Sequence, residues 1–374
     1  MKKIACFAYV NDGDYLWISH FKFNGLFKID LKSDEVSFMG RFSSCGEEKS
    51  QLHHCARKHG SKLYFFPQNG DYVDIYDIET EKFFDVKIPI MYKQYQKTII
   101  NTFMYDDMHI MIPRFVDIPV MIFPSEAPQK IEKIDLTESR KCIRNGSMDL
   151  TLYACIVDDT IYFPIKDTNC IGSFNVREKK ENVIILEGLD KIVGDIEYDG
   201  ENIWISANDG IYKWFPQDNR LVKVCDVASN REQWIEKIIV YKNNIICVPR
   251  WLNKIIIIDK ESLQHESISI DTDKLNQNVA TPWRDVRGVF VWNEKIVILP
   301  VRYSETIFID LNSFHIDYKT YVSNQCMYSL NRVTVMEQNG DNFSEFLEFI
   351  DSLNFKDKIM LNKIGKTIYE EIVG

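Results

Sequence analysis

One unit of four short strands recurs along this chain. Its plainest copy is residues 191–227, KIVGDIEYDGENIWISANDGIYKWFPQDNRLVKVCDV. Apolar runs alternate there with turn residues, and Asp199-Gly200 between two runs is typical of a two-residue hairpin turn, because both turn positions need positive φ. A single meander of this size has too little apolar surface to close a core by itself. The chain is therefore expected to fold as an array of such units.

The end of the second strand makes the period visible. Seven similar segments are 42 to 51 residues apart, and they end at His20, Pro67, Pro113, Pro164, Ala207, Pro249 and Pro300. Repeats of this length are typical of the blades of a β-propeller. We therefore predict an all-β fold, a seven-bladed propeller of four-stranded blades, within residues 1–323. The predicted blades are approximately 3–42, 51–90, 98–136, 149–187, 191–227, 233–271 and 284–322.

A second feature recurs with the same period. About ten residues after four of these ends, the third strand of the unit ends at Asp30, Asp77, Asp259 and Asp310. An aspartate at the end of a strand can accept hydrogen bonds from the backbone N–H groups of the following turn. We predict that these four residues cap turns and take no part in catalysis.

The segment DGENIWISANDGIYKW and the recurring ID[LIK] strand ending resemble the repeats of seven-bladed propellers of the kelch-like, YncE-like and sensor-regulator kinds. The resemblance covers about residues 1–323. It implies the propeller architecture but no particular activity, because propellers occur in hydrolases, lyases and scaffolds alike.

The pattern changes after Val322. Residues 324–340 contain an apolar run that is one of two candidates for closing the ring, the other being the N-terminal strand. Residues 341–374 have apolar side chains at helical spacing, and we predict a short C-terminal helical tail there. This tail either packs on the propeller or contacts a protein partner. The side chains expected to face that partner are Phe343, Phe346, Phe349 and Ile350.

Composition narrows the classes of function. The sequence is 45% hydrophobic, which is enough for a large core, and its net charge of −10 argues against binding to nucleic acid or to an anionic membrane. Its nine cysteines include no CxxC pair, so we expect reduced thiols in a reducing compartment. The N-terminal apolar run is too short for a signal peptide, and no run approaches the ~18 apolar residues of a membrane helix. The prediction is a soluble cytoplasmic protein.

Chemistry is expected at one end of the central channel. In a propeller, the loops before the innermost strand and after the second strand open on the same face. The residues thirteen positions before each second-strand end should therefore line the channel mouth: Phe7, His54, Ile100, Thr151, Gly194, Glu236 and Arg287. Because a buried charge needs a partner, we expect Glu236 and Arg287, from adjacent blades, to pair.

Cationic and aromatic residues follow the second strands or lead into the seventh blade on this same face. Arginine suits bidentate contact with a carboxylate, and tryptophan can stack on a ring. We therefore predict a non-catalytic binding module that recognises a small anionic ligand or an acidic peptide at the channel face. The predicted ligand-binding residues are Arg114, Lys166, Arg250, Trp251, Trp283, Arg284, Arg287 and Arg302.

The alternative is a propeller lyase or hydrolase. His54 and Glu236 would then act as acid and base, with Arg250 and Arg287 holding a carboxylate. The layout resembles the streptogramin-lyase propellers, and that resemblance implies a divalent ion; otherwise no cofactor is predicted. His53 and His54 are adjacent residues of a strand that point to opposite sides, so we expect no metal site there. The motifs GxSxG, HExxH, the P-loop and the EF-hand loop are missing, which favours the binding module.

Overall fold

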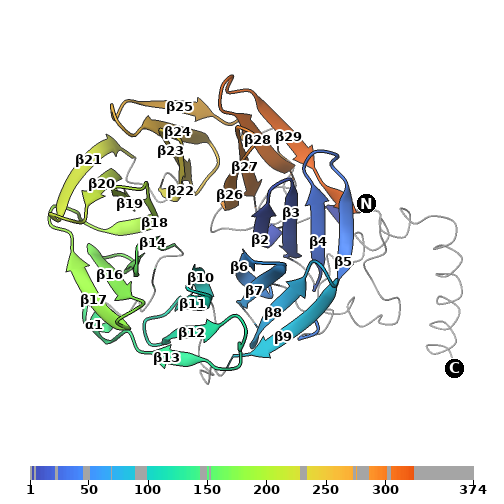
Figure 1. Ribbon diagram of the computed structural model, residues 1–374. Coiled ribbons are helices and arrows are strands. Elements are labelled where there is room, and N and C mark those ends of the chain that lie inside the picture. The colour runs from blue at the N-terminus through green and yellow to red at the C-terminus, as the bar shows by residue number, and fades with distance from the viewer. Residues whose placement is uncertain are drawn as a thin grey trace, which may run out of the picture.

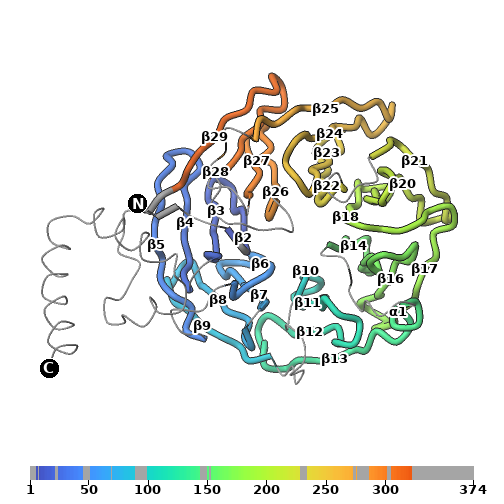
Figure 2. The backbone as a smooth tube through the Cα atoms, turned by 180° about the vertical axis from the view of Figure 1, so that it is seen from behind, coloured from blue at the N-terminus to red at the C-terminus, as the bar shows by residue number. Residues whose placement is uncertain are grey.

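The protein forms a ring of seven four-stranded antiparallel sheets around a central axis (Figure 1), and the same ring is seen from behind in Figure 2. The computed structural model describes residues 2–3, 6–21, 24–44, 51–68, 70–88, 99–143, 150, 153–227, 234–272, 275, 286–300 and 305–323. In each sheet, four strands that are consecutive in the chain pair in order from the channel outward. The predicted all-β, seven-bladed propeller is therefore confirmed.

The first strand of each blade lies nearest the channel. These innermost strands are β2 (Cys6–Asp12), β6 (His53–His59), β10 (Ile99–Tyr105), β14 (Cys155–Val157), β18 (Ile192–Tyr198), β22 (Ile235–Tyr241) and β26 (Val286–Trp292). The second strands are β3 (Tyr15–His20), β7 (Lys62–Pro67), β11 (Met108–Pro113), β15 (Thr160–Pro164), β19 (Ile203–Ala207), β23 (Asn244–Pro249) and β27 (Lys295–Pro300). Each second strand ends at the residue that the sequence repeat predicted.

The third and fourth strands complete each blade. The third strands are β4 (Leu26–Asp30), β8 (Tyr72–Asp77), β12 (Val120–Pro124), β16 (Cys170–Asn175), β20 (Gly210–Phe215), β24 (Lys254–Asp259) and β28 (Glu305–Asp310). The outer strands are β5 (Val36–Gly40), β9 (Lys82–Lys87), β13 (Glu132–Ile134), β17 (Lys180–Ile185), β21 (Arg220–Asp226), β25 (His265–Ser269) and β29 (Ile316–Thr320). One short helix, α1 (Thr137–Lys141), lies between β13 and β14 among the described residues.

The ends of the described chain meet beside the first blade. Strand β1 (Lys2–Lys3) pairs antiparallel with β30 (Val322–Ser323), which follows the last strand of the seventh blade. Of the two candidates for closing the ring, the N-terminal segment is thus the one seen in contact with the seventh blade's end. The predicted strand within 324–340, the helical tail of 341–374 and its partner-facing side chains lie outside the described residues.

The hydrophobic core lies between the blades. Each pair of neighbouring blades encloses one cluster of buried apolar side chains, such as Trp17 and Phe65 between the first two blades and Trp204 and Ile238 between the fifth and sixth. Because the second and third strands pack against neighbours on both faces, they have no polar face, which explains the continuous apolar runs in the sequence. No helix of the described part of the chain is long and apolar enough to cross a membrane.

The aspartates at the ends of the third strands cap turns, as predicted. Asp30 Oδ1 accepts hydrogen bonds from two backbone N–H groups of the next turn, at 2.8 and 3.1 Å. The same pattern recurs at Asp77, Asp259 and Asp310. These backbone hydrogen bonds lower the pKa of Asp30, Asp259 and Asp310, because they favour the ionised carboxylate.

A buried polar chain joins the first two blades. His53, at the start of β6, lies with Nδ1 2.8 Å from Ser19 Oγ of β3 and with Nε2 2.8 Å from Asp74 Oδ2 of β8. All three residues are at most 2% exposed, so the arrangement cannot meet a substrate despite its Ser-His-Asp composition. It joins the first blade to the second. His54, the next residue, points away from it and contacts Arg287.

Burial of a second histidine makes the fold sensitive to acid. His109 of β11 is fully buried, with its ring centroid 4.8 Å from that of Phe123 and 4.0 Å from that of Tyr64. Burial, with a smaller contribution from the nearby His59, lowers the pKa of His109 from 6.5 to about 4. The unfolded chain therefore takes up a proton on this side chain at a higher pH than the folded protein does.

We predict that the stability associated with neutral His109 is complete above pH 6.5 and is lost as the pH falls from 6.5 towards 4. Urea unfolding of the wild type and of His109→Leu over this range should show the wild type losing stability relative to the variant. His315→Leu, which removes an exposed histidine, is the control and should follow the wild type. Parallel curves for wild type and His109→Leu would contradict the prediction.

Candidate ligand site at the channel mouth

Irregular strand pairing marks one end of the channel. Six of the seven innermost strands have a β-bulge near their first residues. In five of them a single residue is skipped by the pairing, and in β18 the irregularity spans Ile192 to Ile196 and includes Gly194. The skipped residues are Phe7, His54, Ile100, Glu236 and Arg287. A bulge redirects a side chain out of the regular alternation, so the predicted channel-mouth ring is a ring of bulged positions. Thr151 lies outside the described residues.

Close packing of β18 against β22 requires glycine at position 194. A Cβ atom placed there would lie 1.9 Å from the carbonyl oxygen of Ile235, which is closer than any real contact. The same carbonyl accepts a hydrogen bond from Ser206 Oγ at 2.8 Å. The fifth and sixth blades are therefore in direct backbone contact at the channel mouth.

Glu236 is the buried anion of this end of the channel. Its side chain is 3% exposed, and its two oxygens are bound separately: Oε2 by Arg250 Nε at 2.9 Å and Oε1 by the Tyr153 hydroxyl at 3.3 Å. Arg250 follows the last residue of β23, and Tyr153 precedes β14. The carboxylate thus links the fourth blade to the loop that follows β23.

The contacts described for Arg287, which was expected to pair with Glu236, are with His54. Arg287 Nη1 lies 3.3 Å from His54 Nε2, and Nη2 donates to the backbone oxygen of His54, so that the seventh blade is linked to the second. Both residues are at bulges, where alternation along the strand no longer sets the direction of the side chain. Their contacts therefore differ from those inferred from neighbouring blades.

Arg250 keeps unused hydrogen-bonding capacity. Its side chain is 14% exposed, and only Nε is bonded, to Glu236; Nη1 and Nη2 bond to none of the residues that the structure describes. Its guanidinium carbon lies 5.7 Å from the centroid of the Trp234 ring, and its backbone N–H donates to the Trp234 carbonyl at 2.8 Å. The guanidinium is thus fixed at Nε, and its two terminal nitrogens have no partner in the described part of the chain.

Trp234 connects this arginine to a second cation. Lys191 Nζ lies 5.8 Å from the centroid of the Trp234 ring. Lys191 directly precedes β18 and Trp234 directly precedes β22, so both are on the face where the innermost strands begin. Neither residue was among the predicted site residues. Their shared position just before an innermost strand is the signal in the sequence that would have found them.

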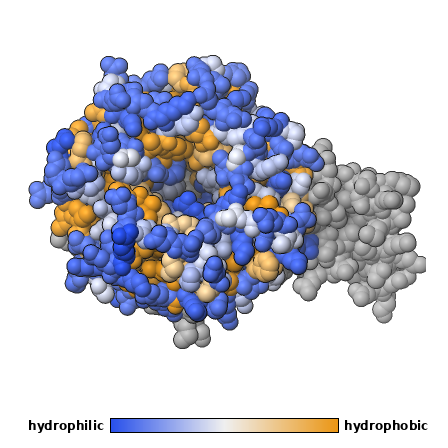
Figure 3. Space-filling model, viewed as in Figure 1, coloured by the Kyte–Doolittle hydropathy of each residue, from blue (hydrophilic) through white to orange (hydrophobic). Residues whose placement is uncertain are grey.

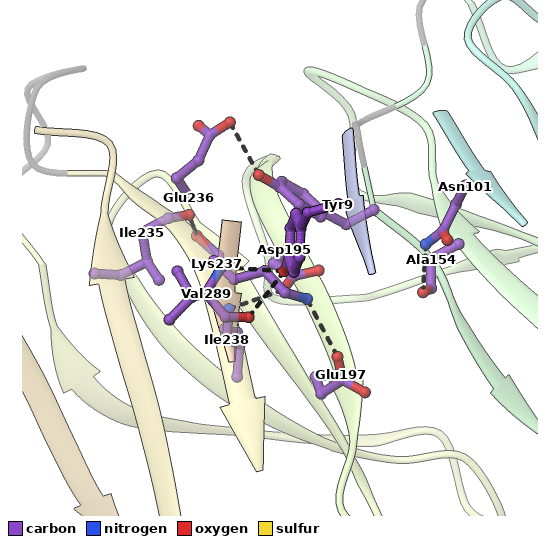
Figure 4. Close-up of polar contacts among 12 residues, drawn as sticks. Tyr9, Asn101, Ala154, Asp195, Glu197, Ile235, Glu236, Lys237, Ile238 and Val289 are labelled. Atoms are coloured by element: carbon purple, nitrogen blue, oxygen red, sulfur yellow. Dashed lines mark hydrogen bonds and ion pairs between the residues drawn. The ribbon is translucent and has the colours of Figure 1, made fainter. Parts of the chain in front are cut away.

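A charged cluster lies deeper along β18 and β22 (Figure 4). Lys237 Nζ donates to Asp195 Oδ2 at 2.6 Å and to Glu197 at 3.3 Å, and the Ile238 N–H donates to Asp195 at 2.8 Å. Burial raises the pKa of Asp195 to about 7 against the opposing effect of the Lys237 ammonium. The two carboxylates raise the pKa of Lys237, despite its own burial. We conclude that the lysine stays charged.

Side chains also bond backbone groups in, or directly before, other innermost strands. The Tyr9 hydroxyl accepts from the Val289 N–H at 3.2 Å and donates to the Val289 carbonyl at 3.1 Å. Asn101 Nδ2 donates to the Ala154 carbonyl at 3.1 Å. Figure 4 shows these contacts together with the charged cluster, and Figure 3 shows the surface hollowed at the centre of the ring.

The remaining predicted ligand residues fall into two groups. Arg114 follows β11, Lys166 lies beyond the end of β15, and Trp251 follows Arg250; all three are half-buried on the channel-mouth face. Trp283, Arg284 and Arg302 lie outside the described residues. Across the described part of the chain, no group of three His, Cys, Asp or Glu side chains is arranged to hold a metal ion.

Comparison with known proteins identifies the fold alone. No protein-family model and no curated protein matches the sequence. The structure is similar to virginiamycin B lyase from Staphylococcus aureus, with a TM-score of 0.61, 11% identity, and coverage of 80% of this chain and 93% of that chain. It is also similar to the extracellular domain of the putative one-component system BT4673 from B. thetaiotaomicron, with a TM-score of 0.57, 11% identity, and coverage of 85% of this chain and 47% of that chain. At these identities the likeness supports the propeller architecture and no shared activity.

The pair between Asp195 and Lys237 is expected to hold the fifth blade to the sixth. Asp195→Leu should destabilise the protein by about 3–5 kcal/mol, because it leaves a partly buried ammonium without its main partner. The double variant Asp195→Leu, Lys237→Met should recover most of that loss, since both charges are then removed. Chemical denaturation of all four members of the cycle measures this. A double variant as unstable as Asp195→Leu would contradict the assignment.

Proposed function

We propose that the protein is a binding module that takes an anionic, carboxylate-bearing ligand at the channel mouth. The observation that carries this proposal is the guanidinium of Arg250, which Glu236 holds through Nε while both terminal nitrogens stay unbonded to the described residues. The two terminal N–H groups of an arginine match the two oxygens of a carboxylate. A half-fixed guanidinium is therefore a preformed receptor for such a group.

Fixing this arginine in advance favours binding. A flexible arginine loses rotamer freedom when it captures a ligand, and that loss weakens binding. Here the bond to the buried Glu236 and the contact with Trp234 restrict the side chain before a ligand arrives. Arg114 and Lys166 add positive charge on the same face, which attracts an anion to an otherwise acidic protein.

The alternative, a lyase or hydrolase using His54 and Glu236, gains no support from the geometry. Both oxygens of Glu236 accept hydrogen bonds within the protein, from Arg250 and Tyr153, and the carboxylate is almost fully buried. A general acid or base has to reach the proton that it transfers. The fold of virginiamycin B lyase is similar, but at 11% identity its activity is not transferred to this chain.

We predict that carboxylates stabilise the full-length protein and that Arg250→Gln removes this effect. A ligand at a hundredfold its dissociation constant adds about 2.7 kcal/mol to the free energy of unfolding. In thermal-shift titrations with acetate, malonate and citrate, the best probe should bind Arg250→Gln at least about tenfold more weakly, because hydrogen bonds to charged groups contribute about 1.5–3 kcal/mol.

Arg220→Gln is the matched control. Arg220 begins β21 at the opposite end of the blade, 54% exposed, with its guanidinium carbon 3.6 Å from the centroid of the Phe215 ring. Its loss removes the same charge without touching the channel mouth, so carboxylate binding should stay at the wild-type level. If no carboxylate shifts the wild type, or if Arg250→Gln responds as the wild type does, the proposed function is wrong.

A further inference from the structure

The indole nitrogen of Trp234 is a donor without an acceptor. Nε1 is shielded from solvent and has no hydrogen-bond partner among the residues that the structure describes. A buried polar group that stays unsatisfied costs about 1–3 kcal/mol, and native structures keep only a few of them. This N–H group lies in the ring that both Arg250 and Lys191 approach. It therefore offers a neutral donor beside two cationic ones.

The side-chain oxygen of Asn208 is a shielded hydrogen-bond acceptor, whereas the Trp234 nitrogen is a donor. Its Nδ2 donates to Asp190 Oδ2 at 2.9 Å, which fixes the orientation of the amide. Its Oδ1 is shielded from solvent and finds no partner within the described ranges. Asn208 follows the last residue of β19, and its backbone N–H donates to the Lys191 carbonyl at 3.2 Å. This acceptor and Trp234 thus both lie in loops at the channel-mouth end of the fifth and sixth blades.

Backbone contacts hold these residues in one place. The Arg250 N–H binds the Trp234 carbonyl, and the Asn208 N–H binds the Lys191 carbonyl, while the Trp234 ring lies less than 6 Å from the charged groups of Arg250 and Lys191. The four residues come from loops of the fifth and sixth blades. We call them the Trp234 cluster: Lys191, Asn208, Trp234 and Arg250.

The charge of the Trp234 cluster suits a ligand with a single negative charge. Arg250 and Lys191 bring two positive charges, and the buried Glu236 offsets one of them. Asp190 is exposed, so water screens its charge. One positive charge is then left for the ligand, which matches a carboxylate rather than a phosphate dianion.

The two orphaned atoms suit an amide next to that carboxylate. An amide presents one N–H and one C=O group, which are the complements of Asn208 Oδ1 and Trp234 Nε1. We infer that the Trp234 cluster recognises an N-acylated amino acid, the chemistry that a peptide presents at its C-terminus. Its carboxylate binds the terminal nitrogens of Arg250, its acyl carbonyl accepts from Trp234, and its N–H donates to Asn208. This inference rests on the proposed function, because it assigns the carboxylate to Arg250.

Isothermal titration of the full-length protein with two simple probes tests the inference. N-acetylglycine carries both the amide and the carboxylate, whereas propionate carries the carboxylate alone. We expect N-acetylglycine to bind at least about tenfold more tightly, since each hydrogen bond to an otherwise unsatisfied buried group recovers about 1–3 kcal/mol. Because neither orphaned atom is open to solvent, the loops have to part slightly to admit the amide.

Trp234→Phe separates the amide from the carboxylate. It keeps an aromatic ring near Arg250 but removes the N–H donor, so it should lower the affinity for N-acetylglycine about tenfold more than it lowers the affinity for propionate. Trp292→Phe removes an indole N–H that donates to Asp14, at the opposite end of the blade, and should change neither affinity. Asn208→Leu removes the acceptor and gives an independent second variant, should Trp234→Phe fold poorly.

The outcomes distinguish the carboxylate site at Arg250 from the recognition of an amide by Trp234 and Asn208. If both probes bind equally and Arg250→Gln abolishes both, the carboxylate site stands and the amide inference is wrong. If neither probe binds the wild type, both are wrong. A peptide with a free C-terminus that binds more tightly than N-acetylglycine, while its C-terminally amidated form does not bind, identifies a peptide ligand. Equal affinities for peptide and N-acetylglycine identify a small N-acylated amino acid.

Discussion

The free edge of the innermost strand is the constraint from which the rest of this structure follows. Each innermost strand pairs with only one neighbour in its blade, so its other edge leaves backbone groups unpaired beside the channel. Side chains from adjacent blades bond several of these groups: Asp195 binds the Ile238 N–H, Tyr9 binds Val289, and Asn101 binds the Ala154 carbonyl. The ring is held at its narrowest part by polar contacts, and outside that by seven apolar clusters.

The same edge explains the position of the proposed ligand site. A bulge near the start of an innermost strand interrupts the hydrogen bonding between strands. The side chain of the unpaired residue then no longer follows the in-and-out alternation of its neighbours. Two of these positions, Glu236 and Arg287, carry charges, and each holds another side chain in place: Arg250 in one case and His54 in the other. The proposed recognition site thus lies where strand pairing is irregular, at the end of the channel to which the second strands also lead.

The architecture could be predicted from the sequence because every blade of a propeller repeats the same order of strands and turns. The second-strand ends recur every 42 to 51 residues, four aspartates follow them at about ten residues, and both features agree with the structure. The bulges near the starts of the innermost strands were not predicted. Side-chain partners do not repeat. The contacts described for Glu236 and Arg287 are with other residues, because direction at a bulge depends on local packing. The Trp234 nitrogen, which has no partner among the described residues, becomes visible only in the folded structure.

The most direct test of the account is to observe the Trp234 indole during ligand binding. The protein has seven tryptophans, so nitrogen-15 labelling of tryptophan gives a small set of indole N–H signals, and the Trp234→Phe spectrum identifies the one that belongs to this residue. Titration with N-acetylglycine should shift the Trp234 signal in the direction of a new hydrogen bond and leave the Trp292 signal unchanged. A Trp234 signal that stays fixed at saturating ligand, or a shift confined to other tryptophans, would place the site elsewhere.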